Sequence, residues 1–510
     1  MAKAALRQVA SCYGWHLCNG LESKELLKRL WMHDLLQEMA NEIIRNESPR
    51  EAGQCSRIWF HEDVLHILNE NTGTDNIEGK KIDLPEPEKV LDLAKALAKM
   101  KKRRLLMVYN AHISDEIQYL SDELRLIDWP GYPSSALPKY FHPKRLVTLN
   151  LSNSRIKHLW KGVKVFKDLK LVSFSCCEFL TEIPDFSMVP NLESLNLDNC
   201  TNLFKVHESV GSLDKLVTLS LLFCSNLRIL PSCFKLRSLH TLSLTGCCKL
   251  RNFPGIAEKM EHIIEILLQG TGIKELPDSI EHLIGLRYLY LEFCQKLEYL
   301  PSGLHKLQDL TSLFLTGCSS LREVPKLPLN IRCIEASDCI SLESFLQLSS
   351  PSSFTPEDSE RLYEMRFINC HKLINKQAQD QILSRLFNEE SHCEAAFPGG
   401  EVPDWFDYHS TNSSISLEVA SRLCGKPVDC FFGAVVELDK AAKATGMLHC
   451  GCEIVISDHR TWFLEKYLGS LESSHVWLTK IKFNCLTWPF NNMRYWNNFE
   501  VSFRISQVSS

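Results

Sequence analysis

One nine-residue pattern recurs through the middle of this chain of 510 residues and constrains its fold more than any other feature. The pattern reads L-x-x-L-x-L-x-x-C, with other apolar residues replacing some leucines, and successive clean copies begin 21 to 24 residues apart. The clean copies begin at Leu146, Leu169, Leu192, Leu216, Leu239, Ile263, Leu286, Leu310 and Ile331, and weaker copies begin at Leu124 and Leu362. A nearly constant period in this range is typical of leucine-rich repeats.

The alternation inside each copy predicts a short strand whose leucines point to one side and whose other residues point to the opposite side. One copy cannot bury its own leucines, so the strands of successive copies must stack in parallel around a shared core. We therefore expect an α/β leucine-rich-repeat solenoid over residues 123–375. Such an array is typical of proteins that act by recognising another protein rather than by catalysis.

The ninth position of the pattern faces inward in this fold, and it is cysteine in most copies. We expect buried, reduced thiols at Cys177, Cys200, Cys224, Cys247, Cys294, Cys318, Cys339 and Cys370. The first residues of the chain lack the apolar segment of a secretory signal, so a cytoplasmic location is expected. The basic run Lys101–Arg104 leaves the nucleus open as an alternative; its other interpretation is a solvated charged face.

Composition and motifs exclude several function classes. The net charge of −5 favours neither a nucleic acid nor a membrane as partner. The chain contains no G-x-x-x-x-G-K-[ST] phosphate loop and no G-x-S-x-G motif, so no enzyme, no catalytic residue and no cofactor is expected. The run His449–Cys452 lacks the second pair of ligands that a closed zinc site needs, so no metal site is expected.

The two ends differ from the repeats. Leu35, Leu36, Met39 and Ile43 share one helical face, which predicts a short helical N-terminal region. Short alternating runs after residue 397 predict a C-terminal all-β sandwich. We expect Trp405 to pack in the core of that sandwich, because so large an aromatic side chain in a Pro-flanked segment usually packs.

Several motifs resemble those of plant intracellular immune receptors (disease resistance proteins) of the TIR-NBS-LRR class. They are Met32-His33-Asp34, Glu47–Trp59, Leu124–Pro138 and Phe397–Phe406. The resemblance implies that the N-terminal region is a winged-helix remnant of the NB-ARC nucleotide-binding module. In full-length relatives the histidine of the first motif helps to hold ADP. Met32, His33 and Asp34 are therefore nucleotide-related candidates, although this chain, lacking a phosphate loop, is not expected to bind ADP or ATP.

The resemblance also implies a domain order and a function. We expect a winged-helix remnant (1–84), a helical linker (85–122), the repeats (123–375), a second linker (376–395) and a C-terminal jelly-roll or Ig-like domain (396–510). The implied function is that of a receptor fragment, without its own TIR segment or phosphate loop, that recognises a pathogen effector or a guarded host protein. The alternative is a non-switching repeat scaffold or decoy that pairs with full-length receptors.

The outward strand positions predict the recognition surface. In most copies they are small and polar, as at Thr148, Asn150, Ser194 and Ser243, and we expect them to face solvent on the concave side. Larger residues are expected to form one partner-binding patch: Leu222, Phe223, Leu267, Tyr288, Tyr290, Glu292, Phe293 and Phe314. The alternative is that the C-terminal domain folds back and covers this patch.

Overall fold

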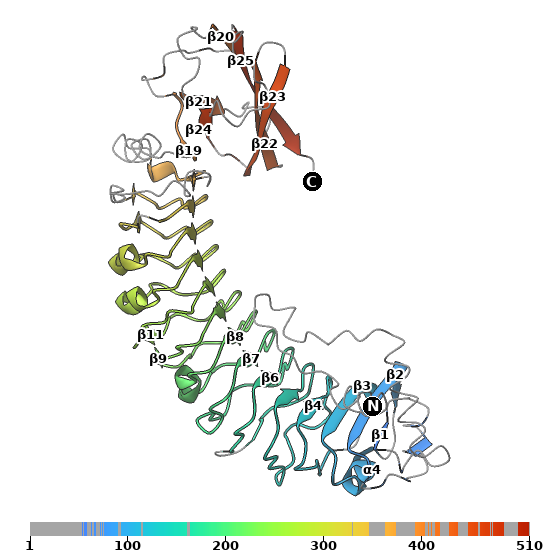
Figure 1. Ribbon diagram of the computed structural model, residues 1–510. Helices are drawn as coiled ribbons and strands as arrows, with labels where there is room; N and C mark the ends of the chain where they lie inside the picture. Colours follow the sequence, from blue (N-terminus) through green and yellow to red (C-terminus); the bar gives the residue numbers. More distant parts are fainter. Residues whose placement is uncertain are drawn as a thin grey trace, which may run out of the picture. The chain divides into compact units, whose positions relative to one another are not determined.

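The computed structural model describes residues 76–89, 93–113, 116–160, 164–328, 330–345, 363–373 and 393–402. It also describes some residues between 54 and 74 and, between residues 406 and 508, the strands named below with a few residues beside them (Figure 1). The contacts of the chain divide it into two units, Met1–Leu216 and Val217–Ser510, and each is described by itself.

The first unit is built on parallel strands. They are β1 (Arg57–Ile58), β2 (Gly79–Lys89), β3 (Leu105–His112), β4 (Leu126–Asp128), β5 (Thr148–Asn150), β6 (Leu171–Ser173) and β7 (Ser194–Asn196). Each pairs with the next in parallel. The 3-10 helix η2 (Glu208–Ser212) lies near the end of this unit.

The segment predicted as a helical linker, 85–122, is helical only in part. It contains α4 (Leu93–Lys99), which buries Leu93 and Leu97 one turn apart, and then β3, which pairs with β4 of the repeats. The apolar run that forms β3 alternates with period two and buries Leu106 and Val108. The row of parallel strands therefore begins before the first repeat that the pattern identified.

The basic run after α4 is not the fully solvated face that one interpretation predicted. Lys101, Lys102 and Arg104 are exposed, but Arg103 is fully buried. Its guanidinium donates to Leu97 O at 3.3 Å and to Met100 O at 3.5 Å, carbonyls at the end of α4, where Leu97 O also accepts the backbone N–H of Met100. Burial lowers the pKa of Arg103 to about 10. This side chain therefore has a structural role in ending the helix.

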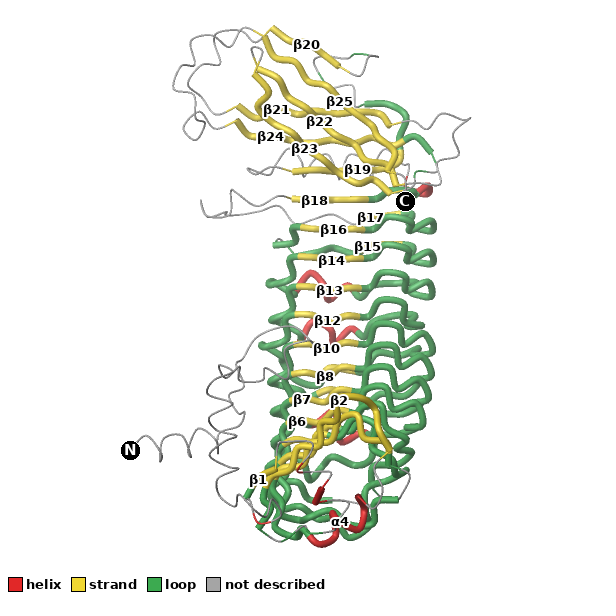
Figure 2. Tube along the Cα trace, turned by 90° about the vertical axis from the view of Figure 1, so that its right-hand side faces the viewer, coloured by secondary structure: helices red, strands yellow, loops and turns green. Residues whose placement is uncertain are grey.

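The repeats of the second unit stack their strands as parallel rungs, as Figure 2 shows for β10 to β18. The strands are β8 (Thr218–Ser220), β10 (Thr241–Ser243), β12 (Glu265–Leu267), β13 (Tyr288–Tyr290), β14 (Ser312–Phe314), β16 (Cys333–Glu335) and β18 (Tyr363–Arg366). The predicted leucine-rich-repeat solenoid is thereby confirmed.

The return segments of these repeats carry short strand pairs and 3-10 helices. The pairs are β9 (Cys233–Phe234) with β11 (Gly255–Ile256), and β15 (Glu323–Val324) with β17 (Ser344–Phe345). The helices are η3 (Asp278–His282), η4 (Ser302–Lys306) and η6 (His371–Leu373). None of the helices in the described part of the chain combines the length and apolarity that crossing a bilayer requires.

The leucines and cysteines of the pattern form the core. In the copy that contains β13, Leu286, Leu289 and Leu291 are fully buried. All eight ninth-position cysteines are buried free thiols, as predicted. Their sulfurs reach back to the preceding repeat: Cys200 Sγ donates to Phe174 O at 3.0 Å, and Cys318 Sγ donates to Leu291 O at 3.1 Å. Each such thiol is a weak donor that satisfies a carbonyl where the chain leaves the strand.

Some of the small polar residues predicted to face solvent are buried instead, namely Thr148, Asn150, Ser194 and Ser243. Others in the same rows, such as Thr241 and Thr245, are partly exposed. Strands in a sheet lie about 5 Å apart, so a short side chain is covered by its neighbours in the adjacent rows. Asn150 also turns its side chain along the sheet, where its Nδ2 donates to Asp128 Oδ1 at 2.8 Å.

Seven further strands complete the second unit: β19 (Cys393–Pro398), β20 (Ser414–Glu418), β21 (Val428–Val436), β22 (Met447–Ile456), β23 (His459–Gly469), β24 (His475–Phe483) and β25 (Asn498–Val508). Strand β19 pairs in parallel with β18 and antiparallel with β24, which also pairs with β21. The other four form an antiparallel sheet in the order β20-β25-β22-β23. Their packing into a sandwich stays a prediction, as do the domain boundaries.

A buried polar joint connects the last repeat to these strands. His475 is buried; its Nε2 accepts the backbone N–H of Asn369 at 2.8 Å, and its Nδ1 lies 2.7 Å from Ser473 O. Nδ1 must carry the proton in this arrangement, because a carbonyl can only accept. Two strands away from the repeats, Trp477 Nε1 donates to Glu394 Oε1 at 2.8 Å, and both side chains are buried. The second unit is therefore joined by specific hydrogen bonds as well as by strand pairing.

Candidate functional site

Three aromatic rings lie together on the face of β13 and β14 opposite the leucine core, which we call the strand face. Tyr290 and Phe314 are paired in register, and their rings stack with centroids 4.7 Å apart at an angle of 5°. Tyr288 lies 6.5 Å from Tyr290, centroid to centroid. The alternation of the strands explains this placement, because Leu289 and Leu313 take the inward positions. We call Tyr288, Tyr290 and Phe314 the aromatic cluster.

The aromatic cluster remains accessible within the unit. Tyr288 is 37% exposed, and Tyr290 and Phe314 are half-buried. Burial raises the pKa of Tyr290, and the charges of Glu265 and Glu292 raise it further. The hydroxyl of Tyr290 therefore sits in a negative electrostatic environment that favours its protonated form.

Carboxylates border the cluster on three sides. Glu265 is in register with Tyr288, Glu335 is in register with Phe314, and Glu292 follows Tyr290 by two residues. Glu265 accepts a hydrogen bond from Thr241 Oγ1 at 3.1 Å, whereas Oε2 of Glu292 is buried with no hydrogen-bond partner among the described residues. Burial raises the pKa of Glu292 and the charge of Glu335 raises it further, although a hydrogen bond from its own backbone N–H acts in the opposite direction.

Arg366 neutralises one side of this acidic border. Its guanidinium lies 3.5 Å from Glu335 Oε2 and forms a shorter ion pair with Glu364. These three residues were absent from the sequence prediction. The signal was present, because Glu335 and Arg366 occupy the fifth position of their copies, as Tyr290 and Phe314 do. Reading the copies as columns of equivalent positions would have found them.

The predicted patch is brought together only in part. Leu267 is in register with Tyr290 and so lies beside the cluster, together with Glu292. Leu222 follows β8, and β10 lies between β8 and β12. Across that gap Thr245 Oγ1 donates to Gln269 Oε1 at 2.5 Å, so a polar contact occupies the interval.

Phe223 and Phe293 occupy the turn after their strands rather than the strand face. Both have positive φ, 57° and 60°, which is rare for a bulky residue. Both are exposed, by 53% and 60%. Their rings lie against Gly246 and Gly317, which hold the equivalent positions in the following repeats. The aromatic residues therefore form two groups, one on the strand face and one along the turns.

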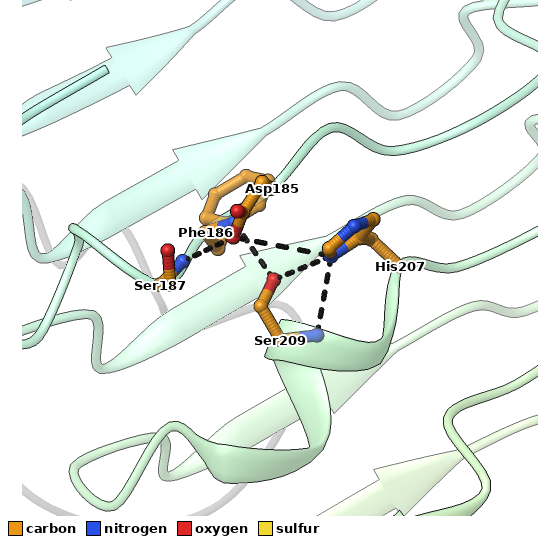
Figure 3. Close-up of polar contacts among 5 residues, drawn as sticks. All are labelled: Asp185, Phe186, Ser187, His207 and Ser209. Atoms are coloured by element: carbon orange, nitrogen blue, oxygen red, sulfur yellow. Dashed lines mark hydrogen bonds and ion pairs between the residues drawn. The ribbon is translucent and has the colours of Figure 1, made fainter. Parts of the chain in front are cut away.

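A serine, a histidine and an aspartate meet in the first unit, as Figure 3 shows, but their geometry is not that of a nucleophile and its base. His207 Nδ1 lies 2.9 Å from Ser209 Oγ, accepts the backbone N–H of Ser209 at 3.2 Å and lies 3.9 Å from Asp185 Oδ1. In a catalytic triad the serine and the carboxylate contact opposite nitrogens of the histidine ring, whereas here Ser209 and Asp185 both lie on the side of Nδ1.

The contacts of this cluster instead connect neighbouring repeats. Ser209 Oγ accepts the backbone N–H of Phe186 at 2.8 Å, and His207 caps η2. In the second unit Ser279 Oγ accepts the backbone N–H of Ile256 at 2.9 Å in the same way. The backbone N–H of Ser187 is the largest cause of the lowered pKa of Asp185. These hydrogen bonds therefore have a structural role, which is to connect the return segments of neighbouring repeats.

Some predicted residues lie outside the described part of the chain. They are Met32, His33, Asp34 and Trp405. Within the described residues, no group of three or more His, Cys, Asp or Glu side chains is placed to hold a metal ion.

Comparison with known proteins gives consistent matches. Residues 236–328 match the family described as "Disease resistance protein RPS4B-like, leucine-rich repeats". The chain is 35% identical over 317 residues to TMV resistance protein N of Nicotiana glutinosa, covering 61% of this chain and 27% of that protein. It is 30% identical over 461 residues to disease resistance protein RPS4B of Arabidopsis thaliana, covering 77% of this chain and 39% of that protein.

A solved structure, the functional domain of InlJ from Listeria monocytogenes, aligns with 74% of this chain and 77% of its own at 13% identity and a TM-score of 0.35. The chain spans less than half the length of either plant relative.

Proposed function

We propose that this chain, a relative of plant disease resistance proteins of the TIR-NBS-LRR class, is the protein-recognition part of an immune receptor. In this proposal it binds a pathogen effector or a guarded host protein through the strand face of its repeats, with the C-terminal strands contributing. The relatives are named as resistance proteins, and residues 236–328 match a leucine-rich-repeat family of such proteins.

The aromatic cluster carries the proposal. Contiguous exposed aromatic residues on a protein surface usually mark a binding site, and tyrosine is enriched among the residues that dominate binding energy. At several other strand positions the side chains are short and buried, as at Ser220 and Ser243. The three rings of the aromatic cluster therefore offer a partner more apolar contact area than those positions do.

A cytoplasmic location is part of the same proposal. The eight ninth-position cysteines are free although they lie close together in the stack, and free thiols persist in reducing compartments. A receptor that meets its ligand inside the cell would keep this core reduced.

Affinity capture tests the proposed function. Wild-type chain and a variant with Tyr288→Ser, Tyr290→Ser and Phe314→Ser are each used to capture proteins from healthy and infected leaf extracts. The control is Phe179→Ser, because Phe179 is exposed but lies after Cys177, away from the strand face. We expect a partner that the wild type and the control retain and the triple variant loses, with similar melting temperatures.

Two other results would be informative. Loss of melting cooperativity or new protease cleavage near residues 348–360 in the triple variant would favour the alternative that C-terminal segments cover the cluster. Capture of a full-length immune receptor, with no effector or guarded protein, would favour the scaffold alternative. Equal capture by all three proteins would contradict the proposal.

A further inference from the structure

One carboxylate oxygen of Glu292 lacks a hydrogen-bond donor among the described residues. Its Oε2 is buried without a hydrogen-bond partner, and Glu292 forms no ion pair within the described part of the chain. Leaving a buried carboxylate oxygen without a partner is unfavourable, so an occupant that supplied a donor to Oε2 would be favoured.

The surroundings of Glu292 define what that donor must be. Tyr288 and Tyr290 lie four and two residues before it along the chain, and Glu335 lies beyond Phe314. Aromatic faces attract cations, and a carboxylate forms its strongest hydrogen bonds with charged donors. An apolar occupant would bury Glu292 further and leave it unpaired.

Arg366, the neighbouring cationic side chain, already forms ion pairs with other carboxylates. Arg366 bridges Glu335 and Glu364, and Thr241 donates to Glu265. The negative charge at Glu292 is therefore not offset from within the rows, and the surface complements a positive charge from outside.

From this charge complementarity we infer that the aromatic cluster and Glu292 form a pocket for a lysine or arginine side chain of the partner protein. The inference rests on the proposed function and adds the chemistry of the anchoring residue. The cationic head pairs with the Glu292 carboxylate while its stem or its planar group packs on the rings of Tyr288 and Tyr290. The partner must then present an exposed basic residue at the centre of the interface.

Peptide selection tests this inference without a known partner. A random peptide library displayed on phage is selected on the immobilised full chain, and binding of the enriched peptides is measured by fluorescence anisotropy. The variants are Glu292→Gln, which keeps the shape and removes the charge, and Tyr290→Leu, which removes one ring. Glu261→Gln is the matched control, because Glu261 is exposed and lies before the strand. Thermal melting establishes that each variant folds.

We expect the enriched peptides to share a lysine or arginine. Replacing it by norleucine or citrulline should weaken binding about tenfold or more, and Glu292→Gln should cause a similar loss. The two changes should not add, because each removes the same pair. Glu261→Gln should bind like the wild type.

The inference and the proposed function fail in different ways. If enriched peptides lose binding to the triple serine variant but tolerate both Glu292→Gln and the neutral peptide, the cationic pocket is wrong and strand-face recognition stands. If no sequence is enriched, or every enriched peptide binds the triple serine variant as well as the wild type, both are contradicted.

Discussion

Phe293 packs its ring against the backbone of Gly317 in the next repeat, where a Cβ atom on Gly317 would come within 2.7 Å of ring carbon Cδ1. The two residues hold the same position of successive copies, and both have positive φ. Phe223 and Gly246 repeat the relationship at 2.5 Å. An aromatic residue can hold this strained turn position because the following copy offers it an open glycine.

Gly317→Ala should therefore destabilise the chain more than the backbone alone requires. Gly270→Ala is the matched control, because Gly270 also has positive φ, 67°, and has no atom near enough to meet an added Cβ. The control should cost about 1 kcal/mol, the penalty for a Cβ in the left-handed region. Gly317→Ala should cost measurably more in chemical denaturation, since the ring of Phe293 must also move. In a Phe293→Ala background the two glycine substitutions should cost the same, and a persisting difference would contradict the packing.

The eight buried ninth-position cysteines, which we call the ladder cysteines, should react more slowly than exposed cysteines. Burial raises the pKa of the Cys294 and Cys318 thiols, and only the thiolate is reactive. Cys200, Cys224 and Cys318 should react slowly with a thiol reagent in the native protein, while exposed Cys248 reacts quickly and serves as an internal reference. Peptide mass spectrometry gives the rate at each site. Disulfides among the ladder cysteines, or equal rates at Cys248 and Cys318, would show that the thiols are not packed as described.

Replacing one ladder cysteine separates charge from size. Cys318→Ser keeps a donor for Leu291 O and should be tolerated. Cys318→Asp places a carboxylate in the core with no cation beside it and should cost about 3 kcal/mol or more in the free energy of unfolding. Similar urea midpoints for the two variants would contradict the inward position of this side chain.

The joint between Asn369 and His475 should make stability pH-dependent. Desolvation lowers the pKa of His475, and the neighbouring His371 lowers it further, although Ser473 and Asp338 act in the opposite direction. The unfolded chain then takes up its proton first as the pH falls through about 6.5, so this group's contribution to stability is present above that pH and declines below it, down to the lower folded pKa. Unfolding free energies at pH 7.5 and 5.5 should differ more for the wild type than for His475→Gln. Equal pH differences in the two proteins would show that His475 does not titrate in this window.

Some features could be predicted from the sequence because they depend on spacing alone. The constant period places each leucine and each ninth-position cysteine in the core, and it also stacks Tyr290 on Phe314. The burial of Asn150 and Ser194 could not be predicted this way, because it depends on how closely adjacent rows approach. The sequence alone predicts that Arg103 lies at the surface, because its hydrogen-bond acceptors are backbone carbonyls at the end of α4 that only the structure shows.

The division of the predicted patch has a similar cause. Leu222 and Leu267 are both outward-facing, but whether they meet depends on the number of strands between them and on the column that each occupies. The ion pair between Glu335 and Arg366 joins two copies of the pattern, which begin at Ile331 and Leu362, across the long segment that separates them in the sequence. Contacts between side chains of different repeats follow from the register of the strands. The repeat period yields that register only when the residues at the same position of successive copies are compared with one another.

Hydrogen–deuterium exchange tests strand-face recognition most directly. The full chain is labelled alone and with the partner obtained by capture, and peptides covering residues 263–316 are compared with those covering 146–198. Recognition by the aromatic cluster predicts slower exchange in the first region on binding, with little change in the second, and no protection in the triple serine variant. Protection confined to residues 146–198, or protection of 263–316 that the triple variant retains, would contradict the account.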